Sequence, residues 1–239
     1  MRKAEEHFLV GAGVLTGVVK HLGLMDREQL TVEALGAEAV TTSEIEGEIL
    51  DRASVQSSIR RQLGLATGNR RVKPAEQGIA EMMVDLYRFF AEPLSAETLF
   101  AWHRMLVKGR GDLRDLGRYR TDDEAMQVVS GAIHAPRVHF EAPPSSKVPK
   151  EMARFVRWFN RTAPTGVEPL QGLTRAGIAH LYFESIHPFE DGNGRIGRAI
   201  SEKALAQCLG QPTLTALAAT ILGRRRAYYD ALEAANRDI

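Results

Sequence analysis

Residues 184–198 read ESIHPFEDGNGRIGR, and this stretch decides the fold of the chain. An apolar helical pattern over residues 177–186 runs into His187 and is stopped by Pro188. A glycine-rich turn follows, and a helical pattern resumes at about residue 193. The first backbone N–H groups of a helix have no intrahelical acceptor and lie at the positive end of its dipole. The stretch therefore predicts a helix, a loop and a second helix, with an anion-binding site at the second helix's N-terminus.

The side chains of this loop suit nucleotide phosphates. Arg195 and Arg198 lie three residues apart, so both project from one face of the first helical turn. Asp191 is the kind of oxygen ligand that Mg²⁺ accepts, and Asn193 can hold a phosphate oxygen without adding charge. His187 titrates near neutral pH and can take a proton from an attacking hydroxyl. Together these residues favour attack on a nucleotide phosphorus.

Other readings of the same residues remain open. Asp-Gly and Asn-Gly pairs are common turn formers, and two arginines on a helix are often only a solvated face. His180, Glu184 and His187 are spaced i, i+4, i+7 and could form a metal triad on one helical face. That triad is not an HExxH motif, and it leaves the glycines and arginines unexplained.

The rest of the chain predicts a mainly α fold. Apolar residues recur every three or four positions, and strand signals are scarce. Residues 126–144 are the exception, because two short β-branched or aromatic runs flank small residues there. We expect a hairpin, and the alternative is a long surface loop. The expected helices cover 44–63, 77–90, 96–107, 150–160, 174–185, 195–209 and 224–235.

Composition excludes several classes of protein. The 239 residues include 31 Lys plus Arg and 30 Asp plus Glu, a balance that argues against nucleic acid as a partner. The single cysteine, Cys208, allows no internal disulfide and no zinc cluster. Residues 8–19 are apolar like a secretory signal, but acidic residues precede them and no cleavage site follows. We expect a packed helix there, with Gly11, Gly13 and Gly17 at close contacts, no membrane association and a cytoplasmic location.

Residues 187–198, HPFEDGNGRIGR, resemble the Fic family, whose signature HxFx(D/E)GNGRxxR they match at every specified position. The resemblance implies a helical Fic bundle over about residues 84–222, with a small β-hairpin flap above the active site. It also implies an adenylyltransferase that uses ATP and Mg²⁺ to move AMP to a Ser, Thr or Tyr hydroxyl of a target protein. On this basis we expect an N-terminal helical region at 1–83 and a catalytic domain at 84–239.

The resemblance also implies a role for each position. His187 looks like the general base, Asp191 like the Mg²⁺ ligand and Phe189 like the core anchor of the loop. The phosphate-binding residues would be Gly192, Asn193, Gly194, Arg195 and Arg198. Tyr228 and Tyr229 would close the adenine pocket, and residues 117–120, GRYR, resemble a structural turn before the flap. Target-docking residues of the flap would be Gln127, Val128, Val129, Ile133 and His134.

A second resemblance lies upstream, where residues 42–47, TSEIEG, fit the inhibitory pattern (S/T)xxxE(G/N) of some Fic proteins. In such a protein, Thr42, Glu46 and Gly47 would belong to an inhibitory helix at about 42–63, with Glu46 pairing with Arg198. Ser43 and Glu46 are also spaced as an ordinary capping box.

Two other functions fit the same residues. Glu46 could orient a water that removes AMP from a modified protein, or the chain could be a nucleotide-binding regulatory module without turnover. The sequence also leaves open whether Glu46 acts within one chain or across a homodimer.

Overall fold

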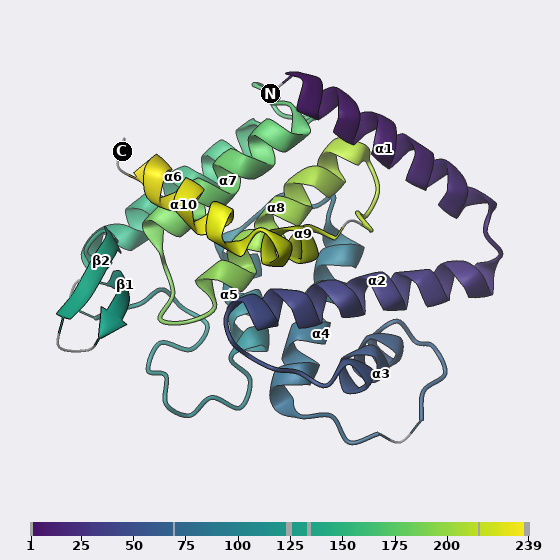
Figure 1. Ribbon diagram of the computed structural model, residues 1–239, viewed down its shortest axis with the longest axis horizontal. Coiled ribbons are helices and arrows are strands. Elements are labelled where there is room, and N and C mark those ends of the chain that lie inside the picture. Colours follow the sequence, from purple (N-terminus) through teal and green to yellow (C-terminus); the bar gives the residue numbers. More distant parts are fainter. Residues whose placement is uncertain (1, 69, 123–125, 133–134, 215, 237–239) are drawn as a thin grey trace.

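The computed structural model describes residues 2–68, 70–122, 126–132, 135–214 and 216–236 (Figure 1). Within them the fold is mainly α, as predicted, and the strands form a two-stranded antiparallel hairpin. The N-terminal helices are α1 (Arg2–His21), α2 (Leu24–Ile45) and α3 (Arg52–Gln62), followed by α4 (Pro74–Phe89) and α5 (Ala96–Leu106). The later elements are β1 (Gln127–Ala132), β2 (Ala135–Glu141), η1 (Ser145–Lys147), α6 (Val148–Arg161), α7 (Gly172–Ile186), α8 (Asn193–Leu209), α9 (Leu217–Gly223) and α10 (Arg225–Asn236).

Helix α8 runs through the centre of the bundle. Its first fourteen residues are buried with the exception of Gly194, although they include two arginines, a lysine and a glutamate. The buried charges have partners: Lys203 Nζ, for example, donates to the carbonyls of Phe89 (2.7 Å) and Phe90 (3.1 Å) at the end of α4. A buried cation is tolerated only where such acceptors satisfy it. The helix that carries Arg195 and Arg198 is thus fixed inside the core.

The aromatic core explains why α6 and α7 lie against this central helix. The rings of Phe155 and Phe159 on α6 and Phe183 on α7 are fully buried and packed on one another. Phe183 in turn contacts Phe189 of the loop between α7 and α8, which is also fully buried. This ring cluster fixes the spacing between the helices on either side of the loop.

The helix predicted over 44–63 is wrong, because α2 ends at Ile45 and α3 begins only at Arg52. Gly47 takes a φ of 83°, a conformation that favours glycine, and the N–H of Glu48 then bonds back to the Ser43 carbonyl at 3.0 Å. Asp51 starts α3 by accepting a bond from the Ser54 N–H at 2.7 Å. Glu46 therefore lies at the end of a helix, and the capping-box alternative for Ser43 and Glu46 is wrong.

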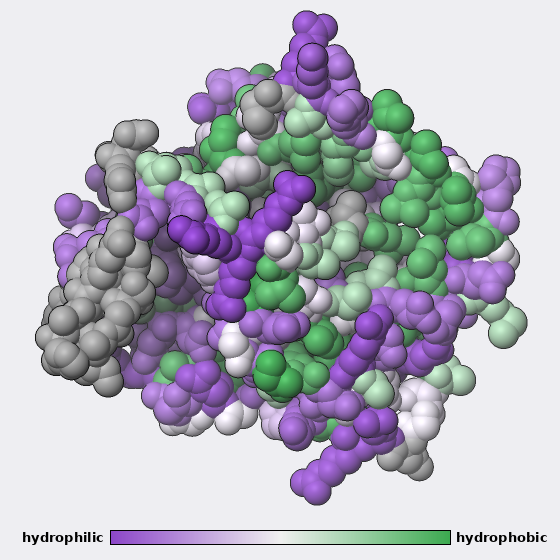
Figure 2. All heavy atoms as spheres, viewed as in Figure 1, coloured by the Kyte–Doolittle hydropathy of each residue, from purple (hydrophilic) through white to green (hydrophobic). Residues whose placement is uncertain are grey.

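The prediction for α1 is partly wrong. Residues 8–19 are helical, but a Cβ placed on Gly11, Gly13 or Gly17 would meet nothing within 4 Å. The helix is fixed at its start, where the Glu5 carboxylate accepts from the Leu173 N–H. From there it runs toward the start of α2, and the two helices form an open angle (Figure 1). Figure 2 shows hydrophobic side chains gathered on the surface over this helix. The side chain of Val10, for example, is 68% exposed. In the described part of the chain, no helix is both long and apolar enough to cross a bilayer.

The hairpin expected over residues 126–144 is confirmed. Gln127 pairs with Glu141, and the register shifts between Val128 and Val129, where the strand bulges. Helix α10 packs beside β2 (Figure 1). Two residues of the expected docking set, Ile133 and His134, lie outside the described residues.

Candidate active site

The catalytic candidate His187 ends α7 in a left-handed conformation, with φ 49° and ψ 61°. Such a backbone is uncommon for a residue with a side chain and needs support from its surroundings. Arg120 provides that support, because its Nε donates to the His187 carbonyl at 2.8 Å while its own N–H donates to the Pro188 carbonyl at 2.9 Å. Burial lowers the pKa of His187 to about 4, so the imidazole is neutral at pH 7 and able to accept a proton.

Arg120 belongs to the stretch that the sequence marks only as a turn. Its side chain is 2% exposed, and the guanidinium also donates to the Ser145 hydroxyl and to carbonyls of residues 143 and 186. These bonds join the loop at 117–120, the segment that leads into η1 and the end of α7. The structure therefore shows Arg120 as a clamp on the backbone of the His187 loop.

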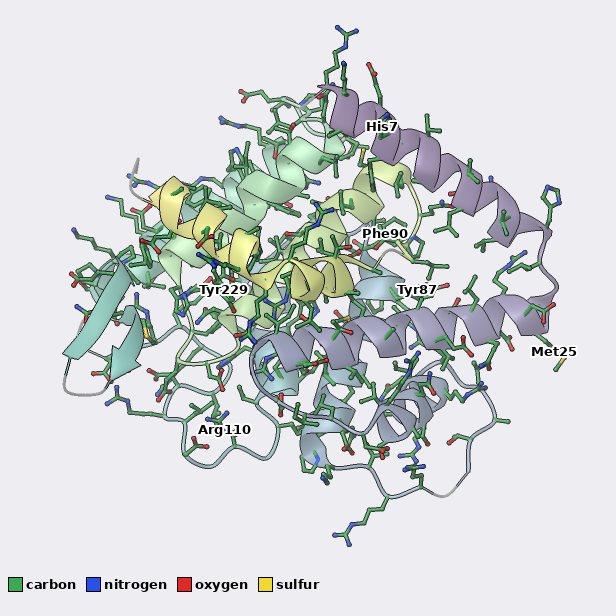
Figure 3. The ribbon with its side chains drawn as sticks, in the orientation of Figure 1. His7, Met25, Tyr87, Phe90, Arg110 and Tyr229 are labelled. Atoms are coloured by element: carbon green, nitrogen blue, oxygen red, sulfur yellow. The ribbon has the colours of Figure 1, made fainter. Side chains whose placement is uncertain are left out.

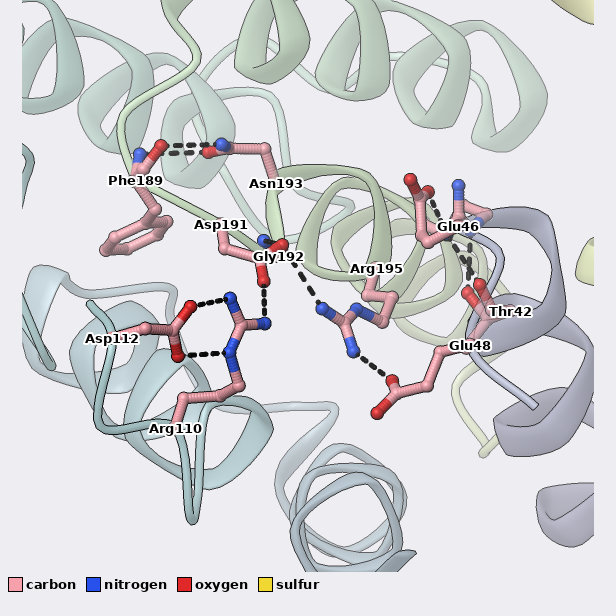
Figure 4. Close-up of polar contacts among 11 residues, drawn as sticks. Thr42, Glu46, Glu48, Arg110, Asp112, Phe189, Asp191, Gly192, Asn193 and Arg195 are labelled. Carbon is pink, nitrogen blue, oxygen red and sulfur yellow. Dashed lines mark hydrogen bonds and ion pairs between the residues drawn. The ribbon is translucent and has the colours of Figure 1, made fainter. Parts of the chain in front are cut away.

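The loop between α7 and α8 is closed by Asn193 and Phe189. The Asn193 amide accepts from the Phe189 N–H at 2.9 Å and donates to the Phe189 carbonyl at 2.8 Å (Figure 4). The Phe189 ring stacks on His103, with centroids 4.3 Å apart. Phe189 is thus the core anchor that the resemblance implies, and in this structure the Asn193 side chain shapes the loop.

Arg195 and Arg198, the two predicted phosphate-binding arginines, are buried, and each pairs with a glutamate from the turn at the end of α2 (Figure 4). Arg198 Nη2 donates to Glu46 Oε1 at 2.6 Å and to the Thr42 carbonyl at 2.9 Å, and its Nε donates to the Thr42 hydroxyl at 2.6 Å. Arg195 Nη1 donates to Glu48 Oε2 at 2.6 Å. The pairing of Glu46 with Arg198 matches the expected geometry, whereas the pairing of Glu48 with Arg195 was not predicted.

Glu46 also lies over the backbone of the predicted anion site. A Cβ added to Gly194 would clash with the Glu46 carboxylate, so the absence of a side chain at 194 lets this acid sit against the first turn of α8. Anions are stabilised at that position by the helix dipole and the free N–H groups. The carboxylate thus occupies the predicted anion site at the start of α8.

The predicted Mg²⁺ ligand, Asp191, is also paired within the chain. Its Oδ2 accepts from Arg110 Nη1 at 2.6 Å, and its Oδ1 lies 3.4 Å from Arg195 Nη2. Arg110, on the loop after α5 (Figure 3), is further bound to Asp112. A single, one-third-exposed carboxylate beside a phosphate site fits Mg²⁺, which takes its remaining ligands from water and phosphate.

The alternative metal triad receives no support. His180 Nε2 is hydrogen-bonded to the Tyr228 hydroxyl at 2.6 Å, and the described residues hold no cluster of three or more His, Cys, Asp or Glu side chains able to bind a metal. Both tyrosines lie on α10, and Tyr228 contacts α7 through His180. The ring of Tyr229 (Figure 3) has its centroid 5.1 Å from that of Tyr228, and Tyr229 is 41% exposed.

The fold and the site together define a helical bundle in which a neutral histidine and two buried arginines flank the loop between α7 and α8. Residues 93–205 match the model of the Fic/DOC family, and residues 1–65 match a domain of unknown function, DUF4172. The first match contains the complete loop and both arginines. The chain therefore contains a Fic domain.

Known relatives agree with this assignment. The chain is similar to protein adenylyltransferase fic-1 of Caenorhabditis elegans, at 27% identity over 61% of this chain and 25% of that protein. It is also similar to a probable protein adenylyltransferase of Aquifex aeolicus, at 32% identity over 48% of this chain and 31% of that protein. The chain thus spans about a quarter to a third of the length of these relatives.

Solved structures share the whole fold. A Fic family protein from Desulfovibrio desulfuricans superposes with a TM-score of 0.66 and 26% identity, over 98% of this chain and 67% of that one. Fic-1 of C. elegans, residues 134–508, superposes with a TM-score of 0.62 and 22% identity, over 98% and 66%.

Proposed function

We propose that this chain is a protein adenylyltransferase, which transfers AMP from ATP to a Ser, Thr or Tyr hydroxyl of a target protein. The observation that carries the proposal is the arrangement at the start of α8: a neutral His187 precedes an anion site whose two arginines are buried, and each forms an ion pair with a partly exposed glutamate. The relatives named as adenylyltransferases support the same activity. The near-neutral net charge of the chain argues against nucleic acid as the target and agrees with a protein target.

In the proposed reaction, the protein supplies a base and groups that stabilise the charge of the phosphates. His187 accepts the proton of the target hydroxyl, the oxygen forms a bond to the α-phosphorus, and the bond from that phosphorus to the bridging oxygen breaks. Pyrophosphate leaves with the bonding electrons, and Arg195, Arg198 and the first amides of α8 stabilise its charge. Mg²⁺, when bound at Asp191, would add Lewis-acid stabilisation of the phosphates.

We further propose that Glu46 inhibits this reaction. Its carboxylate takes the Arg198 guanidinium that would hold the terminal phosphate of ATP, and it brings a negative charge against Gly194. Each charge-assisted bond of this kind is worth about 1.5–3 kcal/mol. Losing Glu46 should therefore raise ATP affinity by roughly ten- to a hundredfold.

The test uses the full chain, Mg²⁺ and ATP labelled at the α-phosphate. Glu46→Gly is expected to label itself or proteins of a lysate more strongly than the parent, and adding His187→Ala is expected to abolish labelling. Equal labelling by Glu46→Gly and the double variant would contradict the mechanism. ATP binding by calorimetry with no labelling in any variant would instead favour a nucleotide-binding module, and Glu46-dependent release of AMP from a modified protein would favour AMP removal.

A further inference from the structure

The described part of the chain leaves one face of α1 uncovered. The opposite face turns inward, since Phe8 packs against the core and Val19 lines the cleft between α1 and α2. On the outward face, Val10, Val14 and Val18 are 68%, 65% and 55% exposed, and Figure 2 shows hydrophobic residues over this helix. An apolar patch of this kind on an otherwise polar exterior marks an interaction site.

The outward residues of α1 follow the spacing of a helix–helix contact. Val10, Gly13, Val14 and Gly17 recur at intervals of three or four residues, so they lie along one side of the helix. A Cβ placed on Gly13 or Gly17 would meet no described atom within 4 Å. Each glycine is therefore an open notch beside an exposed valine, and a side chain of a second helix can insert there.

The order of these residues is complementary to its own reverse. Along α1 the order is valine, glycine, valine, glycine at positions 10, 13, 14 and 17. When a second α1 is laid antiparallel, about a two-fold axis between residues 13 and 14, Val10 lies over the partner's Gly17, and Val14 lies over the partner's Gly13. The two-fold axis makes each contact twice, as in an isologous dimer interface. The face is therefore self-complementary in shape.

The charges at the two ends of this side favour the same arrangement. Glu6 lies near the start of α1 and Lys20 in its last turn, and both are exposed. Within one chain, Glu6 lies 3.5 Å from Arg2 in an exposed pair, which is worth little in water. In the antiparallel arrangement each Glu6 faces the partner's Lys20, whereas in a parallel one it would face a second glutamate. Opposite charges thus select the antiparallel pair.

We infer that the outward face of α1 binds the same face of a second copy of this chain, in an antiparallel pair with two-fold symmetry. A different partner would give the face no reason to match its own reverse in both shape and charge. The 22-residue helix α2 separates this face from the turn that carries Glu46. Pairing through α1 therefore does not depend on the proposed function.

Sedimentation velocity of the full chain tests this contact. One helix from each copy makes a small interface, so we expect a reversible dimer with a Kd on the order of 10 µM. The sedimentation coefficient should rise toward that of a dimer between about 1 and 100 µM. Val14→Glu brings two carboxylates together near the axis and should raise the Kd roughly a hundredfold. Val167→Glu, at an 83% exposed valine outside α1, is the matched control and should leave the Kd unchanged.

Two further changes distinguish a fitted pair from general apolar association. Gly17→Val adds apolar surface but fills the notch, so it should raise the Kd roughly tenfold. Glu6→Lys should also weaken the dimer, and adding Lys20→Glu should restore it, because the exchanged charges again face one another in an antiparallel pair. All these positions are on the outer side of α1, and circular dichroism verifies that each variant folds.

A parent chain that stays monomeric would overturn the inference, and its binding to phospholipid vesicles would then assign the face to a membrane surface instead. An equally tight dimer in Val14→Glu would place the contact elsewhere on the molecule. Tighter association in Gly17→Val, or no recovery when Lys20→Glu is added to Glu6→Lys, would equally contradict the antiparallel pair.

Discussion

The two sides of the loop between α7 and α8 are held in different ways. On one side, Arg120 and Asn193 bind backbone groups of the loop itself, and the Phe189 ring is buried against His103. On the other side, Glu46 and Glu48 hold the arginines of α8 through ion pairs, and both glutamates remain about one-third exposed. The carbonyls that Arg120 and Asn193 bind would lose a hydrogen bond if these side chains were removed. The arginines of α8, in contrast, can exchange a carboxylate for a phosphate as their partner. The first side therefore acts as a scaffold for the loop, and on the second side the glutamates can release the arginines of α8.

The scaffold side should dominate stability. Replacing Arg120 by methionine keeps most of the side-chain volume but leaves several buried carbonyls unpaired, and we expect it to lower the free energy of unfolding by about 3 kcal/mol. Urea unfolding of the full chain measures this loss. Arg226→Met, at a 96% exposed side chain, is the matched control and should change stability by less than about 0.5 kcal/mol. If Arg120→Met lowered the free energy of unfolding no more than the control does, Arg120 would not be part of a stabilising scaffold.

A second test asks whether α2 itself belongs to the scaffold. Glu38 on this helix is 7% exposed and accepts from the Ala218 N–H at 2.7 Å. Burial, with the Glu202 charge nearby, raises the pKa of Glu38 from 4.5 to about 8. The folded chain therefore holds a proton on Glu38 that the unfolded chain releases between these pH values. This contribution is complete below pH 4.5 and is lost as the pH rises through 8.

We therefore expect Glu38→Gln to flatten the decline in the free energy of unfolding over that pH range, with a difference from the parent of about 3–4 kcal/mol between pH 5 and pH 8. Denaturant unfolding at a series of pH values measures the difference, in which the titration of the buried histidines cancels. Glu33→Gln, at an exposed position of the same helix, should follow the parent. Parallel curves for Glu38→Gln and the parent would mean that α2 is not anchored through this side chain.

The sequence predicted the scaffold loop well because its information is local. The HPFEDGNGRIGR stretch contains the proposed base, the glycines and both arginines. The structure places His187 at the end of α7, and the glycines and arginines at the start of α8. Glu46 was found through a resemblance, since its partner Arg198 lies 152 residues away. The helix boundary around it was missed because residues 44–63 have a continuous helical pattern, and the turn depends on the backbone of Gly47.

The missed residues share one property. Glu48 lies 147 residues from Arg195, Arg110 lies 81 from Asp191, and Arg120 lies 67 from His187. Each is a charged residue in a polar stretch, and nothing in its neighbours distinguishes it from a solvated side chain. Glu184 illustrates the reverse case, because its spacing with His180 suggested a metal, whereas His180 is hydrogen-bonded to Tyr228 instead.

The smallest effect is expected for the replacement of Glu48. It tests whether ATP binding is opposed by the Glu46–Arg198 pair alone or also by the Glu48–Arg195 pair. Its carboxylate competes for Arg195 but lies closer to the surface than the pair at Arg198, whose guanidinium is 2% exposed. We expect Glu48→Gln to tighten ATP binding about fivefold, or about 1 kcal/mol, and to change the free energy of unfolding by less than that.

Calorimetric titration of ATP into the parent, Glu46→Gln, Glu48→Gln and the double variant measures both effects and their coupling. Because both glutamates sit on one turn fixed by Gly47, the two substitutions should be less than additive if the turn leaves as a unit. An unchanged affinity in Glu48→Gln would show that Arg195 does not meet the nucleotide while Glu46 remains in place. Full additivity would instead show that each arginine is released separately.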